Sequence, residues 1–318
     1  MHNLISKYIA PRFDIKTLTD AAALDIRDSG RIAFTTDSYV VSPIFFPGGD
    51  IGDLAVNGTV NDLSVSGAKP LYLSSGFIIE EGFLISDLER ILISMSSAAQ
   101  RAGVRIVAGD TKVVERGKGD GIFINTSGIG VIPNPIEMSA SNIKAADKII
   151  ISGKVGSHGT AIIAQRNGLK FEPQLLSDTR PLNAITEAML SVCPNIRIMR
   201  DPTRGGLATT LKEFSEDSGM CMTVYEDYIP IEPRARGACE LMGLDPLYAA
   251  NEGVVLAVVP PDMAQYIVDI MRKIEGSEDA CIIGDVQEEP HGMSVLKTTF
   301  GGSRILDMLP GEQLPRIC

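Results

Sequence analysis

The stretch FTTDSYVVSPIFFPGGDIGDLAVNGTVNDLSVSGAKP, residues 34–70, contains the pattern that decides the fold. It begins at the end of a strand-like apolar run, residues 32–34, and continues into a helical run, residues 54–66, that stops at Gly67. A glycine directly after the last helical position is typical of a helix C-terminus. The passage from strand to helix predicts an α/β unit.

Strand-like and helical runs keep alternating from Arg31 to Ile132, and again after Lys148. In the first block the expected strands are 71–79, 104–108 and 122–131, and the second expected helix, 84–102, stops at Gly103. In the second block the expected strands are 148–152, 221–224, 253–259 and 280–283, and the expected helices are 159–167, 206–218, 234–242 and 262–274. The pattern predicts an α/β (α+β) chain with two such blocks.

A turn-rich segment, residues 133–148, separates the two blocks and suits a connection between domains. We therefore expect a boundary near Ala145, with an N-terminal domain at 1–145 and a C-terminal α/β domain at 146–300. Residues 301–318 combine glycines and prolines without periodicity, which predicts a flexible tail.

Composition and charge exclude several classes of protein. The net charge of −11 repels a phosphate backbone, and no cluster of Lys and Arg offsets it, so we expect no nucleic-acid partner. The longest apolar runs fall far short of the ~20 residues of a membrane-spanning helix. The N-terminal residues resemble no secretory signal, so the expected location is the cytoplasm.

The cysteines favour neither a disulfide framework nor a zinc site. There are five, at positions 193, 221, 239, 281 and 318, which is an odd number without CxxC spacing. Cys318 differs from the others because it ends a segment rich in proline and glycine, where a side chain contributes little to packing. From spacing alone, a functional thiol and an unremarkable chain end carry equal weight.

Several aspartates lie where apolar segments meet small residues: Asp37, Asp50, Asp53, Asp62 and Asp110. Carboxylates clustered in this way are what Mg²⁺ requires when it bridges a protein to nucleotide phosphates. Each aspartate alone is better explained as a turn or cap residue. The signal for a nucleotide site is therefore collective.

Glycine loops and short polar motifs give weaker signals. GSHGTA, residues 156–161, suits phosphate contacts between a strand and a helix, but neither a Walker P-loop nor GxGxxG is present. DPTRGGL, residues 201–207, is also explained as a helix cap. Glu252 could act as a base if it points into a cleft, although spacing alone favours a solvated turn. His158 and His291 are too isolated to predict a triad.

Taken together, residues 34–70, AGDTKVV, DPTRGGL, ANEG and the terminal PRIC resemble the HypE family of hydrogenase maturation proteins over nearly the whole chain. This family belongs to a superfamily with aminoimidazole ribonucleotide synthetase, selenophosphate synthetase and thiamine-monophosphate kinase. The resemblance implies the two-domain fold of that superfamily, a homodimer formed through N-terminal domains that bind ATP, and Mg²⁺ as a second cofactor.

The resemblance also implies a reaction. A carbamoyltransferase partner, HypF, loads a carbamoyl group onto the Cys318 sulfur, and ATP-dependent dehydration then yields a thiocyanate. The cyanide passes to iron on a HypC–HypD complex. By the same resemblance, the expected catalytic residues are Cys318, Glu252 and Lys112. The expected metal ligands are Asp37, Asp62 and Asp110. The expected cofactor-binding residues are Asp37, Asp50, Asp53, Asn61, Asp62, Gly109, Asp110 and Asp201.

The sequence departs from the family pattern near its start. Members of the family open with a glycine-rich HGxGG segment, which is missing ahead of the first helical stretch, and only Asp20 stands where relatives often have two acids. If the segment is truly missing, we expect weaker phosphate contacts and slower ATP turnover. A start codon further upstream, or trimming, explains the difference equally well.

Two other functions fit the residues. A small-molecule phosphotransferase, such as a selenophosphate synthetase or a thiamine-phosphate kinase, would not need the tail. A non-catalytic thiol carrier would use Cys318 while its glycine loops only bound nucleotide. Dehydration of a Cys318-bound carbamoyl group separates both alternatives from the expected activity.

Overall fold

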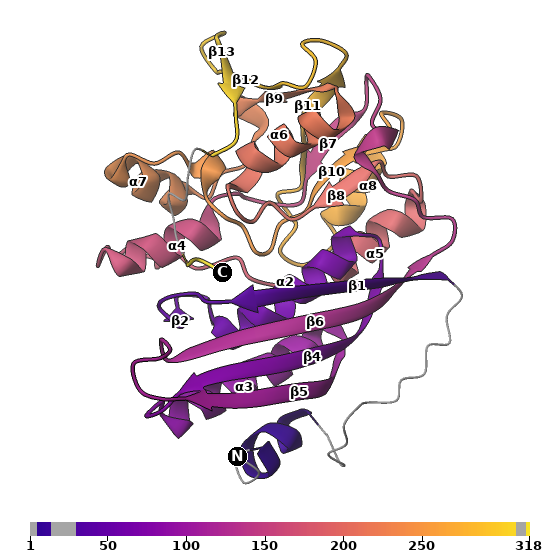
Figure 1. Cartoon of the computed structure of the whole chain (residues 1–318). Helices are drawn as coiled ribbons and strands as arrows, with labels where there is room; N and C mark the ends of the chain where they lie inside the picture. The colour runs from indigo at the N-terminus through magenta and orange to yellow at the C-terminus, as the bar shows by residue number, and fades with distance from the viewer. Residues whose placement is uncertain (1–4, 14–29, 310–315) are drawn as a thin grey trace.

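The computed structural model describes residues 5–13, 30–309 and 316–318 (Figure 1). A four-stranded sheet with the order β1-β6-β4-β5 forms the N-terminal part. Its strands are β1 (Gly30–Tyr39), β4 (Lys69–Glu80), β5 (Arg105–Val114) and β6 (Ile122–Pro133). Only β4 and β5 run parallel, as expected for strands connected through a helix. A small hairpin, β2 (Phe45–Phe46) and β3 (Gly49–Asp50), leads into the first long helix.

Two helices cover one face of this sheet, α2 (Ile51–Val65) and α3 (Ile85–Ala102). Asp50 caps α2, because its side chain accepts hydrogen bonds from the N–H groups of Gly52 and Asp53. Gly103 ends α3 in the left-handed conformation, with φ of 67°. The short helical turns η1 (Ile5–Ile9) and η2 (Ala10–Phe13) precede the sheet, and Ser96 of α3 donates to the Arg12 carbonyl.

The C-terminal part is built on a seven-stranded sheet with the order β13-β12-β9-β11-β7-β10-β8. Its strands are β7 (Lys148–Ile151), β8 (Ile198–Arg200), β9 (Cys221–Tyr225), β10 (Leu256–Val259), β11 (Cys281–Gln287), β12 (Ser294–Lys297) and β13 (Ser303–Leu306). Its helices are α4 (Ser157–Arg166), α5 (Asn183–Val192), α6 (Gly206–Ser218), α7 (Pro233–Met242) and α8 (Ala264–Met271). The short turns are η3 (Ala140–Asn142), η4 (Glu226–Tyr228) and η5 (Pro246–Tyr248).

Every strand and helix predicted from the sequence is present, most with shifted ends and α6 with the predicted ones, and the two-domain α/β fold class is confirmed. The unpredicted helix α5 is only ten residues long and lies between Pro181 and Pro194. The structure differs from the expected tail at residues 303–306, because these form β13 and pair with β12. Asp20 lies outside the described residues, and the boundary near residue 145 stays a prediction.

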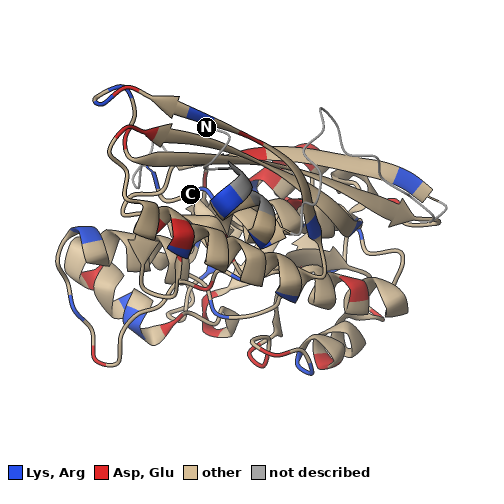
Figure 2. Ribbon diagram, turned by 90° about the horizontal axis from the view of Figure 1, so that it is seen from below, with Lys and Arg blue, Asp and Glu red and all other residues tan. Residues whose placement is uncertain are grey.

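Helices α2 and α3 lie on one face of the N-terminal sheet, and the opposite face, here called the open face, points away from them (Figure 2). Its outward side chains include Ile32, Phe34 and Ile78, which are 65, 68 and 47% exposed. The register of β4 and β5 aligns Lys112 with Ile78, so Lys112 and Asp110 point to this same face. Exposed apolar groups on two strands, β1 and β4, indicate a surface suited to a partner.

The cap of α2 gives a stability test. Asp50→Ala is expected to lower the free energy of unfolding by about 1–2 kcal/mol, because Gly52 and Asp53 lose their acceptor. Asp50 also accepts from Ser94, at 2.5 Å. Urea unfolding gives the measurement, with Asp50→Asn as the control that keeps an acceptor. A loss of ATP binding at unchanged stability would instead favour the cofactor-binding role predicted for Asp50.

Candidate active site

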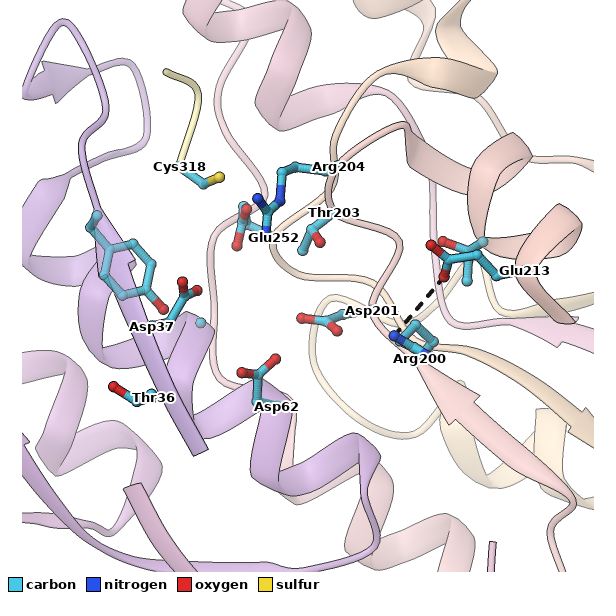
Figure 3. A pocket seen from close by; sticks show the side chains of 13 residues that line it. Thr36, Asp37, Asp62, Arg200, Asp201, Thr203, Arg204, Glu213, Glu252 and Cys318 are labelled. Atoms are coloured by element: carbon cyan, nitrogen blue, oxygen red, sulfur yellow. Dashed lines mark ion pairs between the residues drawn. The ribbon is translucent and has the colours of Figure 1, made fainter. Parts of the chain in front are cut away.

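A pocket of about 300 Å³ lies between the two sheets, where β1 and α2 meet the loops after β8 and before β10 (Figure 3). Its lining is mostly polar, and side chains from both parts of the chain contribute to it. The lining residues are Thr36, Asp37, Tyr39, Gly58, Asp62, Arg200, Asp201, Thr203, Arg204, Thr210, Glu213, Glu252 and Cys318. Five residues predicted to act in one site therefore meet here: Asp37, Asp62, Asp201, Glu252 and Cys318.

Three of these carboxylates come from different elements and point toward one another (Figure 3). Asp37 lies near the end of β1, Asp62 in the last turn of α2, and Asp201 directly after β8. Thr35 donates to Asp62 over 2.9 Å and so faces α2. Because side chains alternate along a strand, Asp37 lies on the same face of β1 as Thr35. The fold thus brings the three acids to one edge of the pocket.

Burial and mutual repulsion disfavour the ionised forms of several acids in this pocket. Burial raises the pKa of Asp62. Burial, followed by repulsion from Asp62, raises the pKa of Asp201 to about 7. Burial, followed by repulsion from Asp201, raises the pKa of Glu252 well above its usual range. A cation placed among these groups would relieve the repulsion and favour their charged forms.

The carboxylates do not form a complete metal cage by themselves. In the part of the chain that the structure describes, no three His, Cys, Asp or Glu side chains are close enough to hold one ion. Mg²⁺ characteristically takes one or two carboxylates, with phosphate oxygens and water as its remaining ligands. The acids therefore suit a magnesium ion that arrives with a polyphosphate.

The loop that carries Glu252 is fixed on both sides. Asp178 accepts hydrogen bonds from the N–H groups of Glu252 and Gly253, each at 3.2 Å. Asn251 accepts from Gly156 N at 2.7 Å and donates to the Pro202 carbonyl. A Cβ on Gly253 would lie 1.8 Å from the Asp178 carbonyl oxygen, so only glycine fits there. These contacts explain the motif NEG, residues 251–253, which holds the backbone of Glu252 in one conformation.

Asn61 links this loop to α2. Its amide donates to the carbonyls of Glu252, at 3.0 Å, and Arg180, at 3.1 Å, and accepts from Leu182 N at 2.8 Å. The side chain is fully buried and all its contacts are to backbone. The structure thus gives Asn61 a positioning role between the two parts of the chain, whereas the predicted contact with a cofactor remains untested.

The Cys318 side chain lies in the pocket, and its sulfur points toward Arg204 and Glu252 (Figure 3). Backbone hydrogen bonds hold the segment: Val40 N donates to the Cys318 carbonyl at 3.1 Å, and Ser42 N donates to the Arg316 carbonyl at 3.2 Å. The thiol and the candidate base therefore share one cavity.

Other predicted residues lie elsewhere. Asp110 and Lys112 pair with each other at 3.0 Å on the open face of the sheet, opposite the face of β1 that carries Asp37. Gly109 packs against Ser75, whose carbonyl oxygen would lie 2.4 Å from an added Cβ. Their predicted roles remain predictions.

Asp50 and Asp53 serve the packing of α2 against α3. Asp50 caps the helix, and Asp53 pairs with Arg101 of α3 at 2.5 Å and accepts from Asn57 at 3.1 Å. Neither side chain lines the pocket. The structure accounts for both acids without a ligand, and their predicted contact with a cofactor is not tested by it.

Sequence reasoning assigned no role in the site to the basic residues of the pocket. Arg204 lies beside the thiol, and Arg200 pairs with Glu213 at 4.0 Å (Figure 3). Both flank the Asp-Pro of DPTRGGL, so a basic residue on each side of a buried acid was the available signal. Gly58, expected from the sequence in a glycine loop, instead lies within α2, and a Cβ there would lie 2.2 Å from the Tyr39 hydroxyl.

Comparison with known proteins agrees with this geometry. Residues 18–132 match the N-terminal domain and residues 144–297 the C-terminal domain of AIR synthase related proteins. The carbamoyl dehydratase HypE of Azotobacter vinelandii is 51% identical over 91% of this chain and 85% of its own length. The chain belongs to the HypE family. A crystal structure of a HypE in complex with ATP is 47% identical, has a TM-score of 0.96 and covers 100% of this chain and 96% of its own. A HypE–HypF complex is 48% identical, with a TM-score of 0.85 and coverage of 96% and 99%.

The raised pKa of Asp201 predicts how stability depends on pH. Asp201→Asn is expected to increase the free energy of unfolding at pH 8 by on the order of 2 kcal/mol, because a carboxylate whose pKa is about 7 no longer has to ionise while buried. Because folding raises this pKa, the Asp201 carboxylate destabilises the wild-type fold increasingly as pH rises. The stability gain of Asp201→Asn should therefore grow between about pH 4 and 7 and then level off. Urea unfolding of the ligand-free protein across this range tests it. A gain independent of pH would contradict the assignment.

Proposed function

We propose that this chain, a carbamoyl dehydratase of hydrogenase maturation, removes water from a carbamoyl group on its own Cys318 sulfur and leaves a thiocyanate. The observation that carries the proposal is the placement of the Cys318 side chain in one pocket with Glu252, Arg204 and the acid cluster. A thiol held there brings any group bonded to it within reach of both a base and a cation.

The chemistry explains why ATP is needed. An amide oxygen is a very poor leaving group, so the carbamoyl oxygen first takes the γ-phosphoryl group of ATP, with loss of one N–H proton and release of ADP. The C–O bond then breaks, phosphate leaves with the former carbamoyl oxygen, and the second N–H proton is lost as the C≡N bond forms. The net loss is one water, whose oxygen ends in phosphate.

Glu252 is the candidate base for the N–H protons. Its backbone is fixed by Asp178 and Asn61, and its side chain lines the same pocket as the thiol. Burial raises its pKa well above the usual range, which makes its ionised form a stronger base but a rarer one. A bound cation would lower that pKa and increase the fraction of Glu252 able to accept a proton.

The cavities suit a magnesium nucleotide. One or two of the carboxylates of Asp37, Asp62 and Asp201 would hold Mg²⁺ against the phosphates, and the ion would screen the negative charge of the transferring group. A second cavity of about 510 Å³ shares Asp62 and Arg200 with the first and has an apolar wall that includes Phe34, Ile198 and Met199. An apolar cavity next to an acidic one fits the nucleoside and the polyphosphate ends of ATP, respectively.

A homodimer would explain the two predicted residues that lie outside the pocket. Asp110 and Lys112 occupy the open face of the sheet, which is rich in exposed apolar groups, and the sheet separates them from the acids of their own chain. A second copy packed there would cover this face and could supply its Asp110 and Lys112 to the neighbouring pocket. Lys112 would then orient the carbamoyl group.

The reaction needs a donor and an acceptor for the group on Cys318. We propose HypF as the carbamoyl donor, supported by the solved complex of a relative with HypF, and a HypC–HypD complex as the acceptor of cyanide. In the described parts of the chain, no helix is long and apolar enough to cross a membrane. We propose a cytoplasmic site of action with these partners.

The central experiment follows the mass of the C-terminal peptide. The chain is incubated with HypF, carbamoyl phosphate and Mg-ATP, beside Glu252→Gln and Cys318→Ala variants. We expect a carbamoyl adduct on Cys318 that loses one water only as ATP is hydrolysed, and at least a hundredfold slower loss in Glu252→Gln, which removes the base.

The outcomes separate the alternatives. Cys318→Ala should carry no adduct. An adduct that never dehydrates would support a thiol carrier. ATP hydrolysis that depends on a small substrate and persists in Cys318→Ala would support a phosphotransferase.

The dimer proposal predicts complementation. Asp110→Ala and Asp37→Ala homodimers should each lack activity, since each damages both sites. Mixed dimers should recover about a quarter of the wild-type rate, because half the dimers are mixed and each has one intact pocket. Rates before and after subunit exchange give the measurement. No recovery would contradict a site shared between two chains.

A further inference from the structure

Residues 316–318 lie beside residues 40–42, which directly follow β1. Val40 N and Ser42 N donate to the carbonyls of Cys318 and Arg316, and the Arg316 guanidinium donates to the Val40 carbonyl at 2.9 Å. These contacts resemble the pairing of an added strand. The Ile317 side chain is only 5% exposed and joins the apolar cluster of the N-terminal part.

His158 of α4 contacts this segment. Its side chain is fully buried, its Nε2 lies 2.5 Å from the Ile317 carbonyl oxygen, and its Nδ1 lies 2.8 Å from Ser177 Oγ. Its ring meets Phe46 edge to face, with centroids 5.5 Å apart. A buried histidine outside the acid cluster thus contacts the residue next to Cys318 in sequence.

The partners define which nitrogen carries the proton. Ser177 Oγ accepts from Thr179 N at 3.1 Å, which leaves its own O–H to donate to His158 Nδ1. The Ile317 carbonyl can only accept, so Nε2 must carry the hydrogen. Burial lowers the pKa of His158 to about 4, in keeping with a neutral ring that has one N–H. The hydrogen bonds that link Thr179, Ser177 and His158 therefore leave Nε2–H as the single donor of the ring, and it points to the Ile317 carbonyl.

The His158 contact differs in burial from the ion pair of the same segment. Arg316 pairs with Asp120, but these side chains are 39% and 63% exposed, and surface pairs contribute little. The His158 hydrogen bond is shielded from water, so its loss would leave buried polar groups without partners. Because Ile317 directly precedes Cys318, fixing its carbonyl limits the directions that the thiol can take.

We infer that His158 is a positioning residue: its Nε2–H holds the Ile317 carbonyl, and this contact keeps the Cys318 thiol in the pocket with Glu252. The inference rests on the proposed function for its catalytic consequence, whereas the docking itself can be measured without catalysis. Ser177 acts behind it by fixing the tautomer of the ring.

The test measures how fast iodoacetamide alkylates Cys318 in the full chain, with the modified peptide resolved by mass spectrometry. His158→Phe keeps a ring against Phe46 but removes the donor, and we expect about tenfold faster alkylation as the docked state becomes less populated. His158→Gln can place an amide N–H near the position of Nε2 and should restore much of the protection. His291→Phe, at an exposed histidine paired with Glu289, is the matched control and should leave the rate unchanged.

Single-turnover dehydration of the carbamoylated protein gives the second measurement. The rate should fall about tenfold in His158→Phe and recover in His158→Gln, while ATP affinity and loading by HypF stay unchanged. A structural defect alone would lower ATP binding and would not be rescued by Gln. If His158→Phe does not fold, Ser177→Ala replaces it and should change both rates in the same directions by a smaller factor.

The failures of the two proposals are distinguishable. Alkylation that is equally fast in the wild type and in a folded His158→Phe or Ser177→Ala variant would overturn the role of His158. Alkylation that responds to His158, in a wild-type protein that never dehydrates its carbamoyl group, would support the docking role and overturn the proposed function.

Discussion

Asn61 joins α2 to the backbone of Glu252 and Leu182 through buried hydrogen bonds, and the placement of the candidate base depends on this link. Helix α2 has almost no freedom to shift, because 14 of its 15 residues are buried. The same helix carries Asp62 into the pocket, so one rigid element sets the distance between the acid cluster and the Glu252 loop. A site built between two domains needs such a link, since the catalytic groups must keep their geometry to within a fraction of an ångström.

The acid cluster is unfavourable to the ligand-free fold and useful to the reaction. Burial and mutual repulsion raise the pKa values of Asp62, Asp201 and Glu252, so part of the folding free energy is spent on holding them together. A magnesium nucleotide would reverse this effect, because its cation replaces the repulsion by attraction. We therefore expect binding of a magnesium nucleotide to increase the free energy of unfolding.

Much of the fold was predictable from periodicity and from helix ends, as Gly103 and the α3 pattern show. The acid cluster was predictable only as a group, since Asp50 and Asp53 have the same sequence context as Asp37 and Asp62. Their contacts in the folded chain distinguish them: Arg101 of α3 pairs with Asp53, whereas Asp62 faces Thr35 of β1.

The contact between His158 and Ile317 was beyond sequence reasoning. The two residues are 159 positions apart, and an isolated histidine is usually a satisfied core residue. Glu252 illustrates the same limit, because a short turn before a strand shows nothing of the buried partners that fix it.

The docking of residues 316–318 has a kinetic consequence. Since the thiol that carries the reacting group belongs to the chain, its encounter with the pocket is intramolecular, and the local concentration is set by the length of the preceding segment. The effective concentration of a group tethered to its own site is commonly in the millimolar range, and it does not fall when the protein is diluted. The pocket can therefore favour the tethered Cys318 thiol over free thiols, and it needs only modest affinity for the carbamoyl group itself.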